Sequence, residues 1–351
     1  MNSALQVHEA LRRKRAGRPV WEWFDRRVRT HQEATAGLGG RMCRGDAACR
    51  RLAAVLDETH SDRPRVLYLH VPFCRRICTF CAFIRQAVSP AIDPYVAALG
   101  REIDAVARRR WSRARPFAAV YFGGGTPTVL DADSLVGLVR QVRERFPLDP
   151  TCEFTVEARF DGVDEDYLAC LRDAGVNRVS FGVQTFDTQI RGRIGRVVDH
   201  DGILRTLDAA GRLGFGSISV DLIYNLPGQT EATWADDLRC LASTPASGAS
   251  VYGLIPFPNS GLCRAIAAGQ EPPLGGINVE YYLHRQADRA LLGRPGWRRM
   301  LPFHYGREGV ETRTYNGSRL GGVDVLGLGC GAGGELNGVA YMHEMDVARF
   351  I

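Results

Sequence analysis

Short apolar runs alternate with longer amphipathic segments from residue 66 to residue 254. The runs are Val66–Val71, Ala118–Phe122, Glu153–Glu157, Arg178–Val183, Ile218–Tyr224 and Ser250–Leu254. Between them, apolar residues recur at helical spacing near 92–110, 132–146, 164–174, 200–214 and 230–242. Strands that alternate with helices of about 10–15 residues are typical of βαβ units and a parallel sheet. The pattern therefore predicts an α/β fold, built on an open doubly wound sheet or on a barrel, complete or partial.

The chain divides into three parts by composition and hydrophobic periodicity. Residues 1–64 are arginine-rich and weakly periodic, which predicts a mostly helical N-terminal extension. Residues 65–260 hold the alternating pattern. In residues 261–351 the pattern weakens to a small α+β part, with a helix expected at 278–291 and short strands around Trp297–Leu301 and Val323–Leu328.

Composition excludes several classes of protein. The 351 residues are 45% hydrophobic and 24% charged, as in ordinary globular proteins and unlike disordered, collagenous or coiled-coil chains. No apolar run approaches the roughly 18 residues that a membrane span needs, and no apolar segment follows the basic start as in a signal peptide. We therefore expect a cytoplasmic protein whose ten cysteines stay reduced.

The net charge of +6 does not indicate a nucleic-acid partner. Of the 45 cationic residues, all but Lys14 are arginine, and they are dispersed along the chain. Nucleic-acid binders usually cluster their cations on one face or along one helix.

Three cysteines stand close together directly after the first predicted strand. Cys74, Cys78 and Cys81 form a C-x3-C-x2-C motif. One face of a helix could carry such a spacing, but Pro72 interrupts the segment and two arginines follow Cys74. A structural zinc site needs four ligands, and no partner pair follows at a usable spacing. A [4Fe–4S] cluster held by three cysteines instead leaves one iron without a protein ligand, open to a substrate or cofactor.

This motif resembles that of the radical S-adenosylmethionine (SAM) superfamily. The resemblance implies that the open iron binds SAM and that an electron from the cluster releases a 5′-deoxyadenosyl radical. It also implies a partial (β/α)6 TIM-like barrel with SAM at the carboxyl ends of the strands, and an electron donor of the flavodoxin or ferredoxin type. The protein positions such a cofactor and excludes water from it.

Further motifs resemble the oxygen-independent coproporphyrinogen oxidase-like branch of that superfamily. They match in order and spacing, and comprise Tyr68–Cys74, 121–128 (Tyr-Phe-Gly-Gly-Gly-Thr-Pro-Thr), 180–186 (Ser-Phe-Gly-Val-Gln-Thr-Phe) and 220–230 (Val-Asp-Leu-Ile-Tyr-Asn-Leu-Pro-Gly-Gln-Thr). The match covers about residues 66–260 and extends more loosely to 335.

The resemblance assigns cofactor contacts residue by residue. These are Tyr68, Phe80, Gly123, Gly124, Gly125, Thr126, Glu157, Gln184, Arg196, Asp221, Ile255 and Gly333. It implies two SAM sites, with Gly124 at the cluster-bound SAM and both Gly125 and Thr126 at the second. The residue types suit this assignment, because glycines admit close backbone approach and charged groups bind the ammonium and carboxylate of SAM.

The branch contains decarboxylases, haem chaperones, C-methyltransferases of natural-product pathways and enzymes that open haem anaerobically. Decarboxylases carry a further cysteine where Phe83 stands, and the segment Arg313–Asn316 lacks the His-Asn and Tyr-Trp pattern of the chaperones. Residues 303–334 resemble those of the haem-utilisation group, the anaerobilin synthases. This resemblance implies C-methylation of a tetrapyrrole, with haem as the expected substrate, and opening of its ring with release of iron.

Two alternatives stay open: a C-methyltransferase acting on another aromatic or peptide natural product, and a haem chaperone. The candidate catalytic residues are Asp221, His304 at the tetrapyrrole, Arg313 at a propionate, and Cys330 in a glycine-rich loop. Relatives in this branch usually continue into a C-terminal domain beyond the position of Ile351. We accordingly expect a truncated or more open substrate cover.

Overall fold

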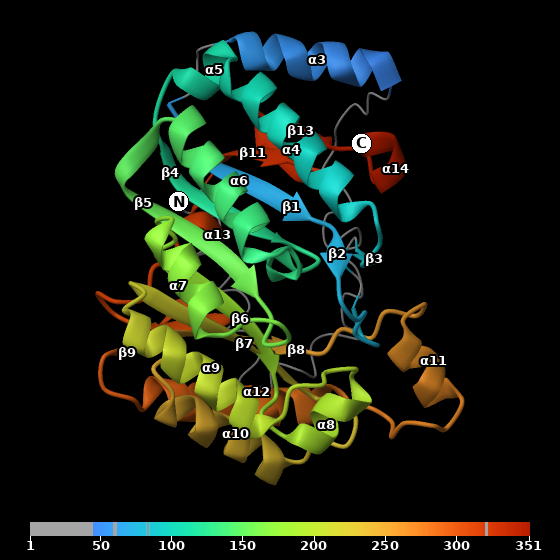
Figure 1. Cartoon of the computed structure of the whole chain (residues 1–351). Helices are drawn as coiled ribbons and strands as arrows, with labels where there is room; N and C mark the ends of the chain where they lie inside the picture. The colour runs from blue at the N-terminus through green and yellow to red at the C-terminus, as the bar shows by residue number, and fades with distance from the viewer. Residues whose placement is uncertain (1–44, 59–61, 82, 84, 320–321) are drawn as a thin grey trace, which may run out of the picture.

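The computed structural model describes residues 45–58, 62–81, 83, 85–319 and 322–351. Within them, the strands form an 11-stranded sheet in the order β13-β12-β11-β1-β4-β5-β6-β7-β8-β10-β9, and a separate pair, β2 with β3. Figure 1 shows most of the helices covering one face of this sheet. Most of the predicted N-terminal extension falls on residues 1–44, outside the described residues; its described part is α3 (Gly45–Asp57).

The six predicted strands are present with small changes of boundary. They are β1 (Arg65–Val71), β4 (Phe117–Gly124), β5 (Leu148–Ala158), β6 (Arg178–Gln184), β7 (Ser217–Tyr224) and β8 (Gly248–Gly253), and each neighbouring pair is parallel. The predicted helices appear as α4 (Ile92–Ala107), α6 (Ala132–Arg145), α7 (Glu165–Asp173), α9 (His200–Leu213), α10 (Glu231–Ser243) and α12 (Ile277–Leu292). Several of them begin behind an aspartate whose carboxylate accepts hydrogen bonds from the first turn, as at Asp131, Asp164 and Asp199.

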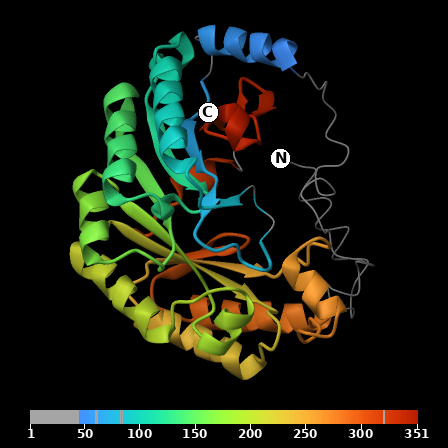
Figure 2. The same cartoon turned by 45° about the vertical axis from the view of Figure 1, so that its right-hand side comes forward.

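The parallel core is extended at both edges rather than closed. On one edge β11 (Asp324–Leu328) runs parallel to β1, followed by antiparallel β12 (Gly333–Leu336) and β13 (Val339–Met342). On the other, β10 (His304–Arg307) and β9 (Trp297–Leu301) add antiparallel to β8. The sheet curves as a partial barrel with an outer arc of helices (Figure 2), as expected.

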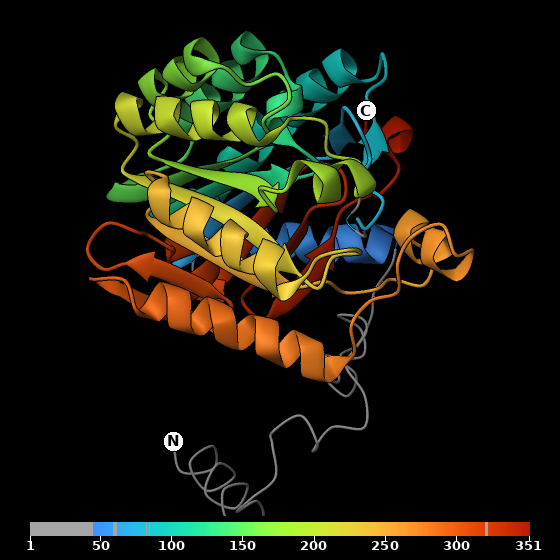
Figure 3. The same ribbon diagram turned by 90° about the horizontal axis from the view of Figure 1, so that it is seen from below.

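Shorter elements that the sequence pattern did not predict complete the fold. They are β2 (Phe73–Cys74), β3 (Gln86–Ala87), α5 (Arg110–Arg113), η2 (Pro127–Val129), α8 (Thr188–Arg193), α11 (Gly261–Ala267), α13 (Thr314–Arg319) and α14 (Val347–Phe350). From below, α12 is the long orange helix along the outer side of β8 and β9 (Figure 3). Among the described helices, none has both the length and the apolar character needed to cross a bilayer.

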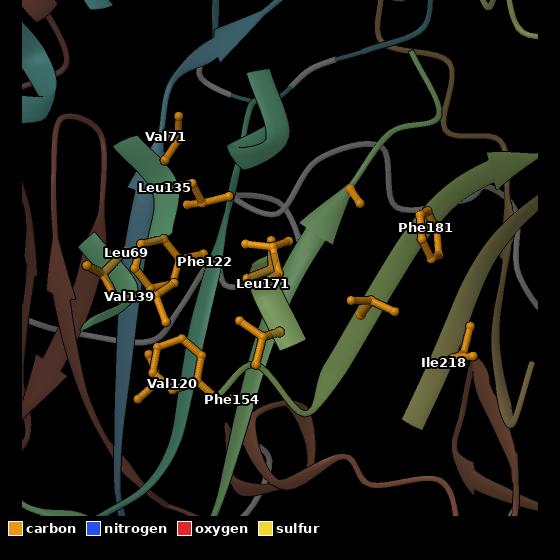
Figure 4. Packing of buried hydrophobic residues seen from close by; sticks show 14 of the residues in the cluster. Leu69, Val71, Val120, Phe122, Leu135, Val139, Phe154, Leu171, Phe181 and Ile218 are labelled. Carbon is orange, nitrogen blue, oxygen red and sulfur yellow. The ribbon is translucent and has the colours of Figure 1, made fainter. Parts of the chain in front are cut away.

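The two faces of the sheet differ in chemistry because side chains alternate along each strand. The outer face carries the apolar core, where Phe122, Phe154 and Phe181 pack beneath helix residues such as Leu135 and Leu171 (Figure 4). The concave face is polar along β5, β6 and β7. Burial of the outer face stabilises the fold, and the polar side chains of the concave face are available to bind a ligand.

Candidate active site

The three cysteines lie in a loop that leaves the carboxyl end of β1. The pairing of β2 with β3 closes this loop on itself. On its far side, the amide of Thr79 donates to the carbonyl of Ile194 at 3.3 Å, and the carbonyl of Thr79 accepts from the amide of Leu262 at 2.8 Å. The loop is therefore held between β1 and the segments that follow β6 and β8, at the end of the sheet where parallel α/β proteins bind ligands.

Two arginines face the middle cysteine. Arg159 Nη1 lies 3.8 Å from the sulfur of Cys78, and the guanidinium of Arg196 lies close enough to interact with that sulfur. Guanidinium groups at this position would offset the negative charge that thiolate ligands bring to a metal site. Arg159 also donates to the carbonyl of Arg76 at 2.7 Å and so supports the loop.

The other two thiols lie close enough to affect one another. Burial raises the pKa of Cys74 and of Cys81, and the neighbouring cysteines raise both further. In the described residues, no three Cys, His, Asp or Glu side chains surround one point as a single metal ion requires. A [4Fe–4S] cluster differs, because each cysteine binds a different iron and the thiols need not surround one point. Three thiols in one loop, with arginines beside them, fit such a cluster.

The Gly-Gly-Gly turn at the end of β4 is required by protein packing. A Cβ on Gly124, whose φ is +110°, would stand 2.6 Å from the ring of His70, and one on Gly125 would stand 2.7 Å from the carbonyl oxygen of Phe73. A Cβ on Gly123 would meet Glu157 Oε2 at 3.0 Å. The space left by the missing side chains is thus occupied by β1 and the cysteine loop, which gives these glycines a structural reason beside the predicted ligand contact.

Glu157 stands at the end of β5 between Tyr121 and this turn. Its Oε1 accepts from the Tyr121 hydroxyl at 2.6 Å, and its Oε2 accepts from the amide of Gly124 at 3.2 Å. Burial raises the pKa of Glu157 to about 7, although the Tyr121 hydrogen bond opposes the rise. The negative charge of Asp221 also raises the pKa of Glu157, so the two carboxyls lie close enough to interact.

Asp221 lies on β7 and is partly exposed on the concave face. Burial raises its pKa, and the hydroxyl of Ser250 on the neighbouring strand opposes this by hydrogen bonding. A cationic ligand between Asp221 and Glu157 would favour the ionised form of both carboxyls. This suits the predicted contact with the ammonium or sulfonium of SAM.

Buried polar atoms on the concave face lack partners. Among the described residues, Gln184 Oε1, Arg196 Nε and Ser219 Oγ make no hydrogen bond. Buried polar atoms are rarely left unpaired, so three of them on one face favour a bound polar ligand. Arg196 itself is held in place by donating from Nη1 to the carbonyl of Gly182 at 3.0 Å. These atoms, with the two carboxyls, fit SAM.

The predicted aromatic contacts have different surroundings. Tyr68 stacks on Tyr121 and Tyr315, with ring centroids 6.3 Å and 6.0 Å away, and its hydroxyl lies 2.9 Å from Nδ1 of His70. Phe80 packs against an apolar cluster that includes Ile223. Tyr68 therefore lines the concave face, and Phe80 fixes the cysteine loop over the end of β7.

The remaining predicted cofactor contacts lie at the margins. The hydroxyl of Thr126 donates to the carbonyl of Gly125 at 2.7 Å and lies 3.4 Å from the sulfur of Cys74. Ile255 follows β8 and is exposed, and Gly333 begins β12 beside Gly327. Their roles stay predictions.

Three of the four candidate catalytic residues are occupied by contacts within the protein. His304 is 1% exposed, with Nδ1 3.0 Å from Ser250 Oγ and Nε2 3.0 Å from Glu311 Oε1. Arg313 donates to the carbonyl of Met300 at 2.5 Å. Cys330 is buried in the apolar core on the other face of the sheet, and burial raises its pKa to about 11, which disfavours a reactive thiolate. Substrate contact by these residues stays a prediction that the geometry does not strengthen.

A buried ionic network, which sequence reasoning missed, fills the floor of the concave face. Arg178 and Glu311 form an ion pair at 2.8 Å, and Glu311 also accepts from Ser217 at 2.5 Å and Ser247 at 3.0 Å. Glu153 accepts from the amides of the first turn of α13. The sequence signal for this network was a charged residue, Arg178, at a strand position that faces inward. Its partner stands 133 positions away, which no local pattern indicates.

Comparisons with known proteins agree with this geometry. Residues 68–241 match the family described as the Radical SAM superfamily. An anaerobilin synthase of Escherichia coli O157:H7 is 35% identical over 295 residues, covering 84% of this chain and 66% of that protein. The heme chaperone HemW of Bacillus subtilis (strain 168) is 31% identical over 288 residues, covering 81% and 74%.

Among solved structures, coproporphyrinogen III oxidase (HemN) from Escherichia coli, described as a radical SAM enzyme, is similar in fold. It has a TM-score of 0.73 at 25% identity and covers 85% of this chain and 70% of that one. The chain thus spans about two thirds to three quarters of the length of these relatives.

Proposed function

The chain belongs to the radical SAM superfamily, in the HemN-like branch close to the haem-utilisation group, and from that premise we propose that it C-methylates haem and opens the ring without oxygen. The observation that carries the proposal is the three-cysteine loop set over a concave face whose buried polar atoms lack partners. The identity with an anaerobilin synthase supports haem as the substrate.

The chain's own residues divide the work of binding. Cys74, Cys78 and Cys81 would hold the cluster. A reduced cluster with SAM supplies a carbon radical, and the family resemblance implies a second SAM as the source of the methyl carbon. Glu157 and Asp221 would bind and orient the cationic part of SAM, since both carboxyls face the concave space.

The surroundings of the site suit an aromatic substrate and an acidic redox partner. Exposed apolar side chains at this end of the sheet, Phe83, Tyr252 and Ile255, offer contacts for a macrocycle. Arg76 and Ile77 line a hollow of about 590 Å³ beside Val197. Because complementary charge guides association, this arginine-bearing hollow is our proposed contact for a donor of the flavodoxin or ferredoxin type.

A haem chaperone is the second candidate, favoured by the 31% identity with HemW over most of both chains. A C-methyltransferase of natural-product biosynthesis is the third candidate.

One experiment tests all three candidates. The reconstituted protein is incubated anaerobically with SAM, a reductant and haem, while the haem absorbance and the SAM products are followed.

The three readings give different results in that experiment. Loss of the Soret band together with 5′-deoxyadenosine and S-adenosylhomocysteine supports haem opening by C-methylation. Intact haem that stays bound supports a chaperone. SAM turnover with haem neither bound nor altered contradicts both and leaves a different methyl acceptor.

A further inference from the structure

Gln184 ends β6 in a backbone conformation that side chains other than glycine rarely adopt. Its φ is +69°, in the left-handed region. Such a conformation persists only where the surroundings hold it, and it often occurs at ligand sites. The contacts on either side of Gln184 therefore decide where its unpaired amide oxygen points.

Asp237 of α10 holds the two residues that follow Gln184. The Thr185 hydroxyl lies 2.9 Å from both Asp237 carboxylate oxygens, and the amide of Phe186 donates to Oδ1 at 2.6 Å. Burial raises the pKa of Asp237 to about 6, and these hydrogen bonds oppose the rise. The carboxylate is 1% exposed, so the bonds are not shared with solvent.

The same carboxylate also holds the loop after β7. Gln229 donates from Nε2 to Asp237 Oδ2 at 3.3 Å, and its Oε1 accepts from the amide of Leu226 at 3.2 Å. Thr185 belongs to the Gln-Thr-Phe motif and Gln229 to the Leu-Pro-Gly-Gln-Thr motif. The proposed function assigns no role to either residue. Both motifs meet at Asp237.

A buried arginine holds Gln184 from the other side. Arg191 donates from Nη1 to the carbonyl of Val183 at 2.5 Å and to that of Thr185 at 3.0 Å, which are the residues flanking Gln184. Its backbone carbonyl accepts from the amide of Arg196 at 2.9 Å. Arg191 thereby links the two predicted SAM contacts: its guanidinium holds the residues that flank Gln184, and its backbone carbonyl holds Arg196.

We propose that Asp237, through Thr185, is a positioning residue that holds Gln184 in its left-handed conformation and so sets the affinity for SAM. This proposal rests on the SAM site of the proposed function. Asp237 touches neither Gln184's side chain nor, by its place on α10, the concave face. Its effect must therefore pass through the backbone of residues 184–186.

The test measures SAM binding and backbone protection separately. In Asp237→Asn the amide nitrogen cannot accept, so one oxygen is left for the three donors Thr185, Phe186 and Gln229. Thr185→Val removes the hydroxyl at nearly constant shape. We expect each to raise the Kd for SAM about tenfold, equivalent to about 1.4 kcal/mol. Binding is measured by equilibrium dialysis on the reconstituted holoenzyme, and hydrogen exchange is followed at the amide of Phe186.

The controls separate positioning from general damage. Thr185→Ser keeps the hydroxyl and should bind SAM as the wild type does. Asp236→Asn alters the adjacent, exposed carboxylate of α10 and should change neither Kd nor exchange. If Asp237→Asn fails to fold, the Thr185→Val and Thr185→Ser pair decides the question.

Each outcome is assigned in advance. A raised Kd with faster exchange at Phe186 and unchanged iron content supports the proposal. An unchanged Kd in Asp237→Asn and Thr185→Val overturns it, whatever the exchange shows. A wild-type protein that carries its cluster but binds no SAM overturns the proposed function instead, and exchange at Phe186 then still shows whether Asp237 holds this segment.

Discussion

The Tyr121 hydroxyl donates to Oε1 of Glu157 at 2.6 Å across adjacent strands of the concave face. Burial raises the pKa of this carboxyl from about 4.5 to about 7. The folded state therefore binds a proton that the unfolded state has released over that interval, and the contribution of Glu157 to stability falls as the pH rises through it. Glu157 is kept at a cost in stability, as expected of a ligand-binding group.

We predict that Glu157→Gln gains stability relative to the wild type as the pH rises from 4.5 to 8. A glutamine does not titrate, and a shift of this size corresponds to about 3 kcal/mol. Urea unfolding of the cluster-free protein at pH 5 and pH 8 measures the change. Glu144→Gln, on the exposed face of α6, is the matched control and should lack it; equal behaviour of the two variants would contradict the prediction.

The floor network gives the opposite pH dependence. Although burial works to raise it, the pKa of Glu311 is held at about 2 by Arg178 and by the hydrogen bond from His304. Its stabilising contribution is present above the unfolded value near 4.5 and is lost as the pH falls toward 2. Glu311→Gln leaves Arg178 buried without its counter-ion, so we expect a loss of about 3–5 kcal/mol at pH 7.

A nearby exposed ion pair provides the control for this prediction. Glu308 pairs with Arg298 at 2.7 Å, with both side chains more than half exposed. Such a pair contributes less than about 1 kcal/mol, so Glu308→Gln should be nearly neutral in the same urea unfolding experiment. Similar losses in both variants would show that the floor network does not stabilise the fold as an ion pair.

The parts of the fold with strong periodicity were predictable from the sequence. The parallel strands β1 and β4 to β8 are each an apolar run, because the outer face of the sheet is buried beneath helices. The elements missed were short or at an edge, such as β2, β10 and β13, where few residues leave no readable period. Their positions depend on tertiary pairing, as His304 opposite Ser250 shows.

Only the residues of the site that belong to recognisable motifs could be predicted from the sequence. The three cysteines were singled out by spacing, and the concave-face residues followed from the family resemblance. Arg159, Arg191 and Asp237 were not predicted from the sequence, because each acts through contacts with segments distant in sequence or through backbone atoms. His304 illustrates the reverse: a chemically suggestive residue in the sequence is fully paired in the floor.

Cys78→Ala should remove the iron–sulfur cluster. Two thiolates cannot replace three, and the arginines that face Cys78 would then stand beside an alanine. We expect loss of bound iron and of the brown absorbance after anaerobic reconstitution. Cys170→Ala, at an exposed position on α7, should keep both. Unchanged iron in Cys78→Ala would contradict the assignment of the cysteine loop.

Two glycine substitutions should act in opposite directions. Gly124→Ala places a Cβ 2.6 Å from the His70 ring at a φ of +110°, so strain and overpacking add. We expect it to lower stability by at least about 2 kcal/mol and to reduce iron loading, because His70 and the turn support the cysteine loop.

Gly137→Ala is the matched control for the loss of a glycine. Gly137 lies on the exposed side of α6, and a Cβ there would meet no atom within 4 Å. Alanine is the better helix former by about 1 kcal/mol, so this variant should be more stable than the wild type and load iron normally. Thermal unfolding and iron analysis of both variants test the pair. If Gly124→Ala also proves stabilising and loads iron fully, then the turn does not pack against His70, and the glycines of β4 serve the ligand alone.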